Sequence, residues 1–401
     1  GSVTVQGNNS GTSVLDTTAS NFALGAGSVN IATSSTLNIH SSTLTITGTS
    51  GTLFTRDGTF TIGGNSTTTF SGNGSATLNS GTITFDTLNS TGIGTKTLGA
   101  GITVSSAKTF TVSAGTFDPA SNLVTGSGTN TLAVSSGATI LVDASTFAGN
   151  YSSGFTTRTL DAASTVDYNL AGTQTIDSTL TYGNLTTSGA SGTKSLNGTT
   201  TANGTLTLSD TATLDTTGSN YALNVANLTF SGGTLAANNS TVTVSGTGGT
   251  PVTYTSGSLT GTSTIAYTGN NAGGDTTVAT GLTYYNLTLN NASETYQITG
   301  TLTTNSAGIV TAVAGTFDFN DQMASIGSLS IGASGTVLGG TGTVTLSGSW
   351  TNSGTFTKET STMSFTGGTT ATISGTTTFY DLSISHSAAK EVNFSVDRKS
   401  V

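Results

Sequence analysis

Threonine or serine alternates with a bulky apolar residue along most of this chain. The clearest stretches cover residues 43–46, 59–62, 109–112, 205–208, 241–244 and 343–346. A period of two residues rich in β-branched side chains predicts a strand with one buried and one hydrated face. Threonine suits the hydrated face because its branched Cβ fits a pleated surface. We therefore expect short strands throughout the chain.

Clusters of Gly, Asn, Ser and Asp separate these stretches. Examples are SGNGS at 71–75 and TGNNAGG at 268–274. These residue types tolerate turn conformations that other residues avoid. No segment shows a sustained period of 3.6 residues, and runs of good helix formers are absent. The sequence predicts an all-β protein.

A longer pattern repeats four times along the chain. STTTFS, STVDYN, STIAYT and STMSFT begin 98, 99 and 98 residues apart, at Ser66, Ser164, Ser263 and Ser361. A near-constant period of this kind is typical of stacked or serially linked units. We predict one continuous array over 1–401, with super-repeats at 1–98, 99–196, 197–298 and 299–401, the last of them truncated.

Two more motifs keep the same phase. An aspartate motif contains Asp16, Asp118, Asp215 and Asp318, and an aromatic–leucine motif contains Leu88, Leu185, Leu287 and Leu382. Aspartate in a turn commonly accepts a hydrogen bond from its own backbone, so we expect this role for the four aspartates. They lie too far apart along the array to share a metal ion.

A lysine follows the aromatic–leucine motif in three of the four copies. These are Lys96, Lys194 and Lys390, whereas Thr295 stands at the matching place in the third copy. The missing copy suggests that these charges decorate the surface while the apolar pattern is what must recur.

Two architectures are compatible with these patterns. The first is a right-handed parallel β-solenoid, in which runs beginning at Thr43, Thr59, Thr82 and Thr103 mark successive coils, about five to a super-repeat. The second is a string of immunoglobulin-like β-sandwiches, which also need about 100 residues each. No linker composition separates the copies, and Trp350 is the only tryptophan, so no core tryptophan recurs. The solenoid is therefore the leading prediction.

The low charge supports the solenoid. Charged residues make up 7% of the chain, against about 25% in ordinary globular domains. Matching positions on adjacent coils lie about 4.8 Å apart, where like charges repel each other. A net charge of −9 without a basic patch argues against nucleic-acid binding. No apolar run is long enough for a membrane-spanning helix.

Candidate catalytic groups are few. Asp318 and Asp321 are the closest carboxylate pair, and Asp143, Asp161, Asp167 and Asp177 are more loosely grouped. The sequence pairs none of them with a basic residue or a histidine. His40 and His386 lie far apart and predict surface or turn positions. We expect no enzyme activity, no catalytic, cofactor-binding or metal-binding residues, and no cofactor.

Aromatic side chains are the remaining candidates for binding. The pairs Tyr284–Tyr285 and Phe379–Tyr380, together with Trp350, carry rings that can stack on sugars. The bland interpretation is that one ring of each pair lies in the core and the other at the surface. Surface glycans are the partner that this site would take.

Regular Thr-x-Thr pairs raise the hypothesis of ice binding. That activity needs a long, in-register and uninterrupted threonine array on one face. The pairs vary in spacing along the sequence and are interrupted by Ser, Asn and Gly, which argues against it. Thermal hysteresis of the purified protein is the deciding measurement.

Two stretches, 182–215 (YGNLTTSGASGTKSLNGTTTANGTLTLSDTATLD) and 347–357 (SGSWTNSGTFT), resemble the β-strand repeats of large bacterial surface and secreted proteins. Filamentous-haemagglutinin-like and autotransporter-type adhesins belong to that group. The resemblance implies a right-handed β-helix, export to the cell surface, and an adhesive or filament-forming role. It implies no catalytic residues.

The sequence thus predicts an extracellular structural protein that forms the shaft of a surface filament or adhesin. We expect the protein to join head to tail with itself or with neighbouring segments of a longer chain, because no capping helix is visible at either end. A carbohydrate-binding surface module is the alternative. A polysaccharide-cleaving β-helix acting through Asp318 or Asp321 is a further one.

Overall fold

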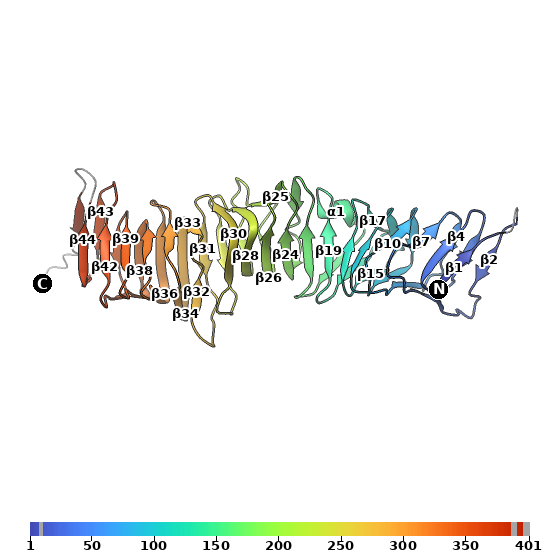
Figure 1. The fold of residues 1–401 in the computed structure, drawn as a ribbon, viewed down its shortest axis with the longest axis horizontal. Helices are drawn as coiled ribbons and strands as arrows, with labels where there is room; N and C mark the ends of the chain where they lie inside the picture. The colour runs from blue at the N-terminus through green and yellow to red at the C-terminus, as the bar shows by residue number, and fades with distance from the viewer. Residues whose placement is uncertain (8–10, 386–390, 396–401) are drawn as a thin grey trace. The chain divides into compact units, whose positions relative to one another are not determined.

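The computed structural model describes residues 1–7, 11–385 and 391–395 and shows a parallel β-solenoid of about 18 turns (Figure 1). It comprises two compact units, Gly1–Gly192 and Thr193–Val401, which are described separately below. The strand stretches predicted above lie in strands, except that Ile62 falls just after the end of one, and the two Gly- and Asn-rich segments lie between strands. The all-β solenoid prediction is confirmed, and the sandwich alternative is wrong because neighbouring strands pair in parallel.

In the first unit the six turns from β1 to β18 each contribute strands to three ladders, and the later turns contribute to fewer of them. The first ladder contains β1 (Ser2–Val5), β4 (Ser28–Ile31), β7 (Thr52–Arg56), β10 (Ala76–Ser80), β13 (Thr95–Thr97), β16 (Thr116–Asp118), β19 (Thr139–Val142), β21 (Thr165–Tyr168) and β24 (Asn184–Thr187). The second has two parts: β2 (Val14–Asp16), β5 (Thr36–Asn38) and β8 (Thr59–Thr61), then β11 (Ile83–Phe85), β14 (Ile102–Val104) and β17 (Val124–Gly126).

The third ladder of this unit contains seven strands. They are β3 (Leu24–Ala26), β6 (Thr43–Ile46), β9 (Thr67–Phe70), β12 (Thr87–Ser90), β15 (Thr109–Val112), β18 (Thr131–Val134) and β20 (Thr157–Leu160). Two further strands, β22 (Gln174–Ile176) and β23 (Thr181–Tyr182), follow β21. The one helix among the described residues, α1 (Phe147–Asn150), is a single turn capped by Thr146, and it is far too short to cross a membrane.

The second unit contains longer strands, several of which bend from one face to the next at register shifts. The long strands are β26 (Thr200–Ser209), β28 (Leu223–Ala236), β30 (Val252–Thr260), β34 (Asn286–Ile298), β36 (Ile309–Asp318) and β38 (Ser328–Leu338). The short ones are β25 (Thr193–Leu196), β27 (Thr213–Asp215), β29 (Thr241–Val244), β31 (Thr264–Tyr267), β32 (Thr276–Val278), β33 (Thr283–Tyr284), β35 (Leu302–Thr304), β37 (Ala324–Ile326), β39 (Thr343–Leu346), β40 (Trp350–Asn352), β41 (Thr355–Thr357), β42 (Thr362–Phe365), β43 (Ala371–Ser374), β44 (Asp381–Ile384) and β45 (Val392–Ser395).

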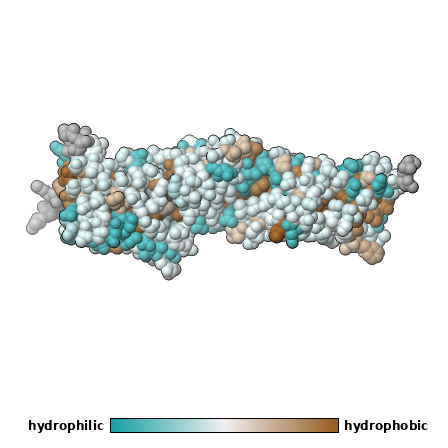
Figure 2. Space-filling view, in the orientation of Figure 1, coloured by the Kyte–Doolittle hydropathy of each residue, from teal (hydrophilic) through white to brown (hydrophobic). Residues whose placement is uncertain are grey.

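Apolar side chains stack in columns inside both units. In the second unit the paired residues Leu287, Val310, Leu329, Trp350 and Ile373 form one such column, and all are buried. Outward positions carry mainly Thr, Ser and Asn, so most of the face in Figure 2 has intermediate hydropathy with scattered apolar and polar patches. The alternation in the sequence therefore becomes an apolar interior and an uncharged polar exterior.

The length of a turn differs from the sequence prediction. Thr43 and Thr59 lie in successive turns but on different ladders, because β6 pairs with β9 and β8 pairs with β5, so the interval between them is not the length of a turn. In paired strands, aligned residues of neighbouring turns are 19 to 26 residues apart. Ser66 lies just before β9, and the third ladder runs from β9 through β12, β15 and β18 to β20, which is four turns. The next repeated serine, Ser164, follows β20 within a few residues. One super-repeat therefore spans just over four turns rather than five.

The repeated serines share one local setting but do not all lie on the same face, because β9 belongs to the third ladder of the first unit and β21 to the first ladder. Ser66, Ser164, Ser263 and Ser361 are buried, and each immediately precedes a strand: β9, β21, β31 and β42. In every copy this strand pairs with the strand of the aromatic–leucine motif, with partners Thr68 and Leu88, Val166 and Leu185, Ile265 and Leu287, and Met363 and Leu382. The repeat thus encodes a pair of adjacent turns. The exact limits of the four super-repeats stay a prediction.

The prediction that the repeated lysines decorate the surface is wrong for the two that the structure describes. Lys96 and Lys194 are fully buried, and Lys96 Nζ donates to the carbonyl of Gly74 over 2.6 Å. Burial lowers the pKa of Lys96 because the charged form loses hydration. Lys390 lies outside the described residues.

The third copy replaces the lysine by a tyrosine. Thr95 and Lys96 pair with Thr116 and Phe117, whereas Thr295 and Tyr296 pair with Thr316 and Phe317. Tyr296 therefore takes the place of Lys96, one residue beyond the predicted match at Thr295. Its buried hydroxyl donates to backbone carbonyls of the preceding turn, at Tyr267 (3.3 Å) and Gly269 (3.4 Å). Lysine in the first copy and tyrosine in the third therefore both donate a hydrogen bond to backbone carbonyls at this position.

Candidate functional site

The aromatic residues predicted to stack on sugars have different environments. Tyr284 and Trp350 are fully buried, and Trp350 Nε1 donates to Thr377 Oγ1 over 3.1 Å. Phe379 packs edge-on against Trp350 with ring centroids 5.1 Å apart. Tyr285 is half-buried, and Tyr380 is exposed with Lys358 Nζ 5.6 Å from its ring centroid. Each aromatic pair thus has one inner and one outer ring, as the pattern predicted.

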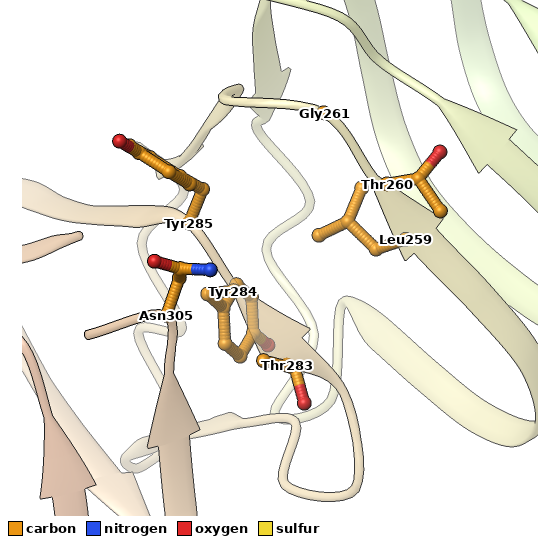
Figure 3. A pocket seen from close by; sticks show the side chains of 7 residues that line it. All are labelled: Leu259, Thr260, Gly261, Thr283, Tyr284, Tyr285 and Asn305. Atoms are coloured by element: carbon orange, nitrogen blue, oxygen red, sulfur yellow. The ribbon is translucent and has the colours of Figure 1, made fainter. Parts of the chain in front are cut away.

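A small open pocket adjoins Tyr285 (Figure 3). Its volume is about 220 Å³, and it is lined by Leu259, Thr260, Gly261, Thr283, Tyr284, Tyr285 and Asn305. In Figure 3 the ring of Tyr285 and the amide of Asn305 lie on one side, and Leu259 and Thr260 lie on the strand opposite. The Asn305 Oδ1 accepts from the backbone N–H of Ala307 over 3.0 Å, which fixes the amide. The lining offers one ring and several polar groups.

Tyr284 belongs to the interior beneath this pocket. Its hydroxyl lies 3.3 Å from that of Tyr267 and donates to the carbonyl of Ala279 over 2.8 Å, while the N–H of Ala279 donates to Tyr267 over 3.2 Å. Burial raises the pKa of Tyr267 to about 12. These groups form a closed ring of hydrogen bonds, so Tyr284 is structural and Tyr285 is the residue left to meet a ligand.

The same ring occurs one copy earlier. Tyr168 and Tyr182 hydroxyls lie 2.9 Å apart, Tyr182 donates to the carbonyl of Asp177 over 2.8 Å, and the N–H of Asp177 donates to Tyr168 over 3.1 Å. In the first copy the corresponding rings are Phe70 and Phe85, with centroids 6.1 Å apart. The pair is therefore either two tyrosines or two phenylalanines in these copies.

The four motif aspartates fill the predicted role in turns. Their Oδ1 atoms accept from the backbone N–H two residues later, at 2.6 to 2.8 Å, in Asp16, Asp118, Asp215 and Asp318. The following residues take positive φ, for example 63° at both Thr18 and Thr217. The carboxylate stabilises a backbone conformation that non-glycine residues rarely adopt.

One carboxyl pair was not predicted. Asp118 and Asp143 lie on neighbouring turns, and burial together with the nearby Asp118 carboxyl raises the pKa of Asp143 to about 6. Next to Asp143, the Oδ1 of Asn150 accepts from the backbone N–H groups of Asp143 and Ala144, both at 2.7 Å. The Asp143 carboxyl therefore keeps its proton to a higher pH than an exposed aspartate does. No sequence signal marks it, because the contact depends on the length of the turn.

Two further carboxylates have basic partners that the sequence did not predict. Asp177 accepts from Arg158 over 3.0 Å, and Asp16 lies 2.8 Å from His40 Nε2. His40 has a φ of 43°, in keeping with the predicted turn position, and His386 lies outside the described residues. In the predicted pair, Asp318 accepts from Asn320 and Asp321 from the N–H of Thr341 over 2.8 Å. Both of these carboxylates bind backbone.

The described residues hold no cluster of three metal-ligating side chains. No family model, no curated protein and no solved structure matches the chain.

Proposed function

We propose that this chain is an extracellular structural protein that forms the shaft of a surface filament or adhesin. The observation that supports this most is the recurrence of one arrangement from turn to turn. Apolar columns fill the interior, uncharged polar side chains cover the exterior, and the same strand pair follows each buried serine. Each turn then contacts its neighbours alone, so the array extends by adding turns.

The experiment is immunoelectron microscopy of the cells that make the protein. Antibodies raised against the purified chain should label filaments on intact cells, and protease added outside should remove the label. Label that appears only after the cells are permeabilised would contradict the proposal. Labelling spread evenly over the envelope without filaments would contradict the shaft role while leaving the location intact.

A head-to-tail contact with a second copy is part of this proposal. In the last described turn Leu382, Ile384 and Phe394 are 37%, 50% and 61% exposed. Their partners one turn earlier, Met363, Phe365 and Ile373, are buried. A further parallel turn covers such side chains, and the first turn of a second copy supplies one. A contact between unlike ends that does not close produces a fibre.

Sedimentation velocity over a range of concentrations tests this contact. The wild-type chain should form larger species as its concentration rises, and Phe394→Lys should abolish them. Val313→Lys, on an exposed site away from this turn, is the matched control and should assemble normally. A wild-type chain that stays monomeric at every concentration would contradict the contact.

The second candidate function is carbohydrate binding, which the pocket at Tyr285 favours. Aromatic rings stack on the apolar faces of sugars, and amide and hydroxyl groups bind their hydroxyls. A volume of about 220 Å³ suits one sugar ring better than a longer ligand. A glycan array should give a signal that Tyr285→Ala removes and the half-buried Tyr221→Ala keeps. Equal signals for both variants would refute the assignment.

A further inference from the structure

One sheet of the first unit has two columns of outward side chains that are almost all threonine. We call the twelve positions on β6, β9, β12, β15, β18 and β20 the threonine face. The first column is Thr43, Thr67, Thr87, Thr109, Thr131 and Thr157, and the second is Thr45, Thr69, Asn89, Thr111, Ala133 and Thr159. Ten of these twelve positions are threonine, and the first column is uninterrupted over six turns.

The threonine face stays in register although its sequence spacing varies. Thr43 pairs with Thr67 after 24 residues, Thr67 with Thr87 after 20, and Thr131 with Thr157 after 26. The pairings along this sheet show no bulge or register shift. The variation lies in the connections between the strands. In the sequence, the unequal spacing of the threonines argued against a regular array. In the fold, the threonines are nevertheless aligned from strand to strand.

The face presents a two-dimensional lattice of hydroxyl and methyl groups. Neighbouring strands lie about 4.8 Å apart, and positions i and i+2 of one strand lie about 6.7 Å apart. These intervals are close to the repeats of water oxygens on a prism face of ice. Most of the threonines are half-buried by their neighbours, and β-branched side chains have few rotamers, so little freedom is lost on binding an ordered lattice.

The face carries no charge. Between its two columns the inward side chains Leu44, Thr68, Leu88, Phe110 and Leu132 are buried and hold the strands from behind. On the last strand Arg158 points inward to Asp177, with its guanidinium 5.1 Å from the ring centroid of Phe147. Lys108, just before β15, forms an ion pair with Asp86 at 3.2 Å and contacts Gly64 and Asn65.

Another threonine column in the same unit serves as a comparison. Thr95, Thr116, Thr139 and Thr165 align on β13, β16, β19 and β21. The neighbouring column of that sheet contains two carboxylates, Asp118 and Asp167, with Leu141 between them. Charges of this kind keep their own hydration shell and interrupt an ice-like layer of water. The uncharged, two-column arrangement is what distinguishes the threonine face.

We propose that the threonine face binds ice. Its hydroxyl groups hold water molecules at lattice positions, and its methyl groups fill the spaces between them. Ice binding is independent of the structural role proposed above, because it needs one face of one unit and no assembly. A shaft that reaches beyond the cell and carries such a face would attach the cell surface to ice.

The experiment measures thermal hysteresis and ice-affinity partitioning of the full chain. The wild type should lower the freezing point below the melting point and should enter growing ice. Thr109→Tyr, at the centre of the first column, should reduce both effects to the level of buffer, because the larger ring lifts the surface away from the ice. Thr139→Tyr on the comparison sheet is the matched control. Tyrosine is favoured in strands, and circular dichroism confirms that both variants fold.

Each outcome decides one part of the proposal. Loss in Thr109→Tyr with activity retained in Thr139→Tyr supports it. A folded wild type without hysteresis or partitioning into ice refutes ice binding. Equal loss, or no loss, in both variants refutes the assignment to this face. None of these results bears on surface labelling or filament formation, so the structural proposal is judged separately.

Discussion

At the scale of single residues, the interior contains more polar chemistry than the composition suggests. Inside the solenoid Lys96 donates to a backbone carbonyl, whereas the hydroxyls of Tyr168 and Tyr267 accept from backbone N–H groups. Burial also raises the pKa of Asp143 to about 6. Buried polar groups are tolerated because hydrogen bonds compensate their lost hydration. Their individual substitutions should therefore have large and specific effects on stability.

The carboxyl of Asp143 gives a pH-dependent prediction. Its pKa of about 6 in the folded chain lies above the ordinary 3.8, so the folded state binds more protons between these values. The free energy of unfolding therefore falls as the pH rises from about 4 to 6. Asp143→Asn should stabilise the chain by about 1–2 kcal/mol at pH 8 and by much less at pH 4. Urea unfolding at both pH values measures this.

The control for that measurement is Asp57→Asn, on an exposed turn. It should change the urea midpoint little at either pH. A gain for Asp143→Asn that is the same at pH 4 and pH 8 would contradict the role of its charge.

The tyrosine ring at Asp177 gives a second prediction. Tyr168→Phe and Tyr182→Phe should each destabilise the chain by about 1–2 kcal/mol, because each leaves a buried group without its partner. The double substitution should cost less than the sum, with a coupling energy of about 0.5–2 kcal/mol. Chemical denaturation of the four proteins completes the cycle. Strict additivity would show that the ring does not act as a unit.

At the scale of elements, the sequence predicts strands and turns well but not how they associate. The alternation at 43–46 and the aspartate at Asp16 are local signals, and both structures form as expected. The pairing of β6 with β9 rather than β8 is not local, because it depends on three strands fitting into one turn. The proximity of Asp118 to Asp143 and the burial of Lys96 likewise depend on which strands pair, here β16 with β19 and β13 with β10 and β16. The repeat period of the sequence does not show which strands pair, so it could not predict these features.

Glycines at one corner of the turns show how closely the turns stack. A Cβ added at Gly48, Gly72 or Gly92 would lie 2.3, 1.9 or 2.0 Å from a backbone carbonyl oxygen of the turn before. Gly72→Ala should therefore destabilise the chain by about 2 kcal/mol or more. Gly64→Ala, where a Cβ meets no atom within 4 Å, should change stability by less than about 1 kcal/mol. Comparable urea midpoints for the two variants would contradict close stacking.

At the scale of the whole molecule, stability should depend on complete turns. Residues 309–327 form one turn of the second unit, and their removal lets β34 pair with β38 and β35 pair with β39. This deletion should keep the far-ultraviolet circular dichroism of a β protein and a cooperative thermal transition, because each turn contacts its neighbours alone. Deletion of 309–318 removes part of a turn and shifts every later strand to another face. It should unfold or aggregate.

The central claim is that the repeated motifs form neighbouring strands of stacked parallel turns. The chain has no cysteine, so introduced pairs report on this directly. Oxidation followed by mass spectrometry should show a disulfide in each of four double variants, because paired Cα atoms on adjacent strands lie within disulfide range. The pairs are Thr67 with Thr87, Thr165 with Asn184, Thr264 with Asn286, and Thr362 with Asp381. Failure of all four, or equal cross-linking when the second cysteine is moved two residues along, would contradict the account.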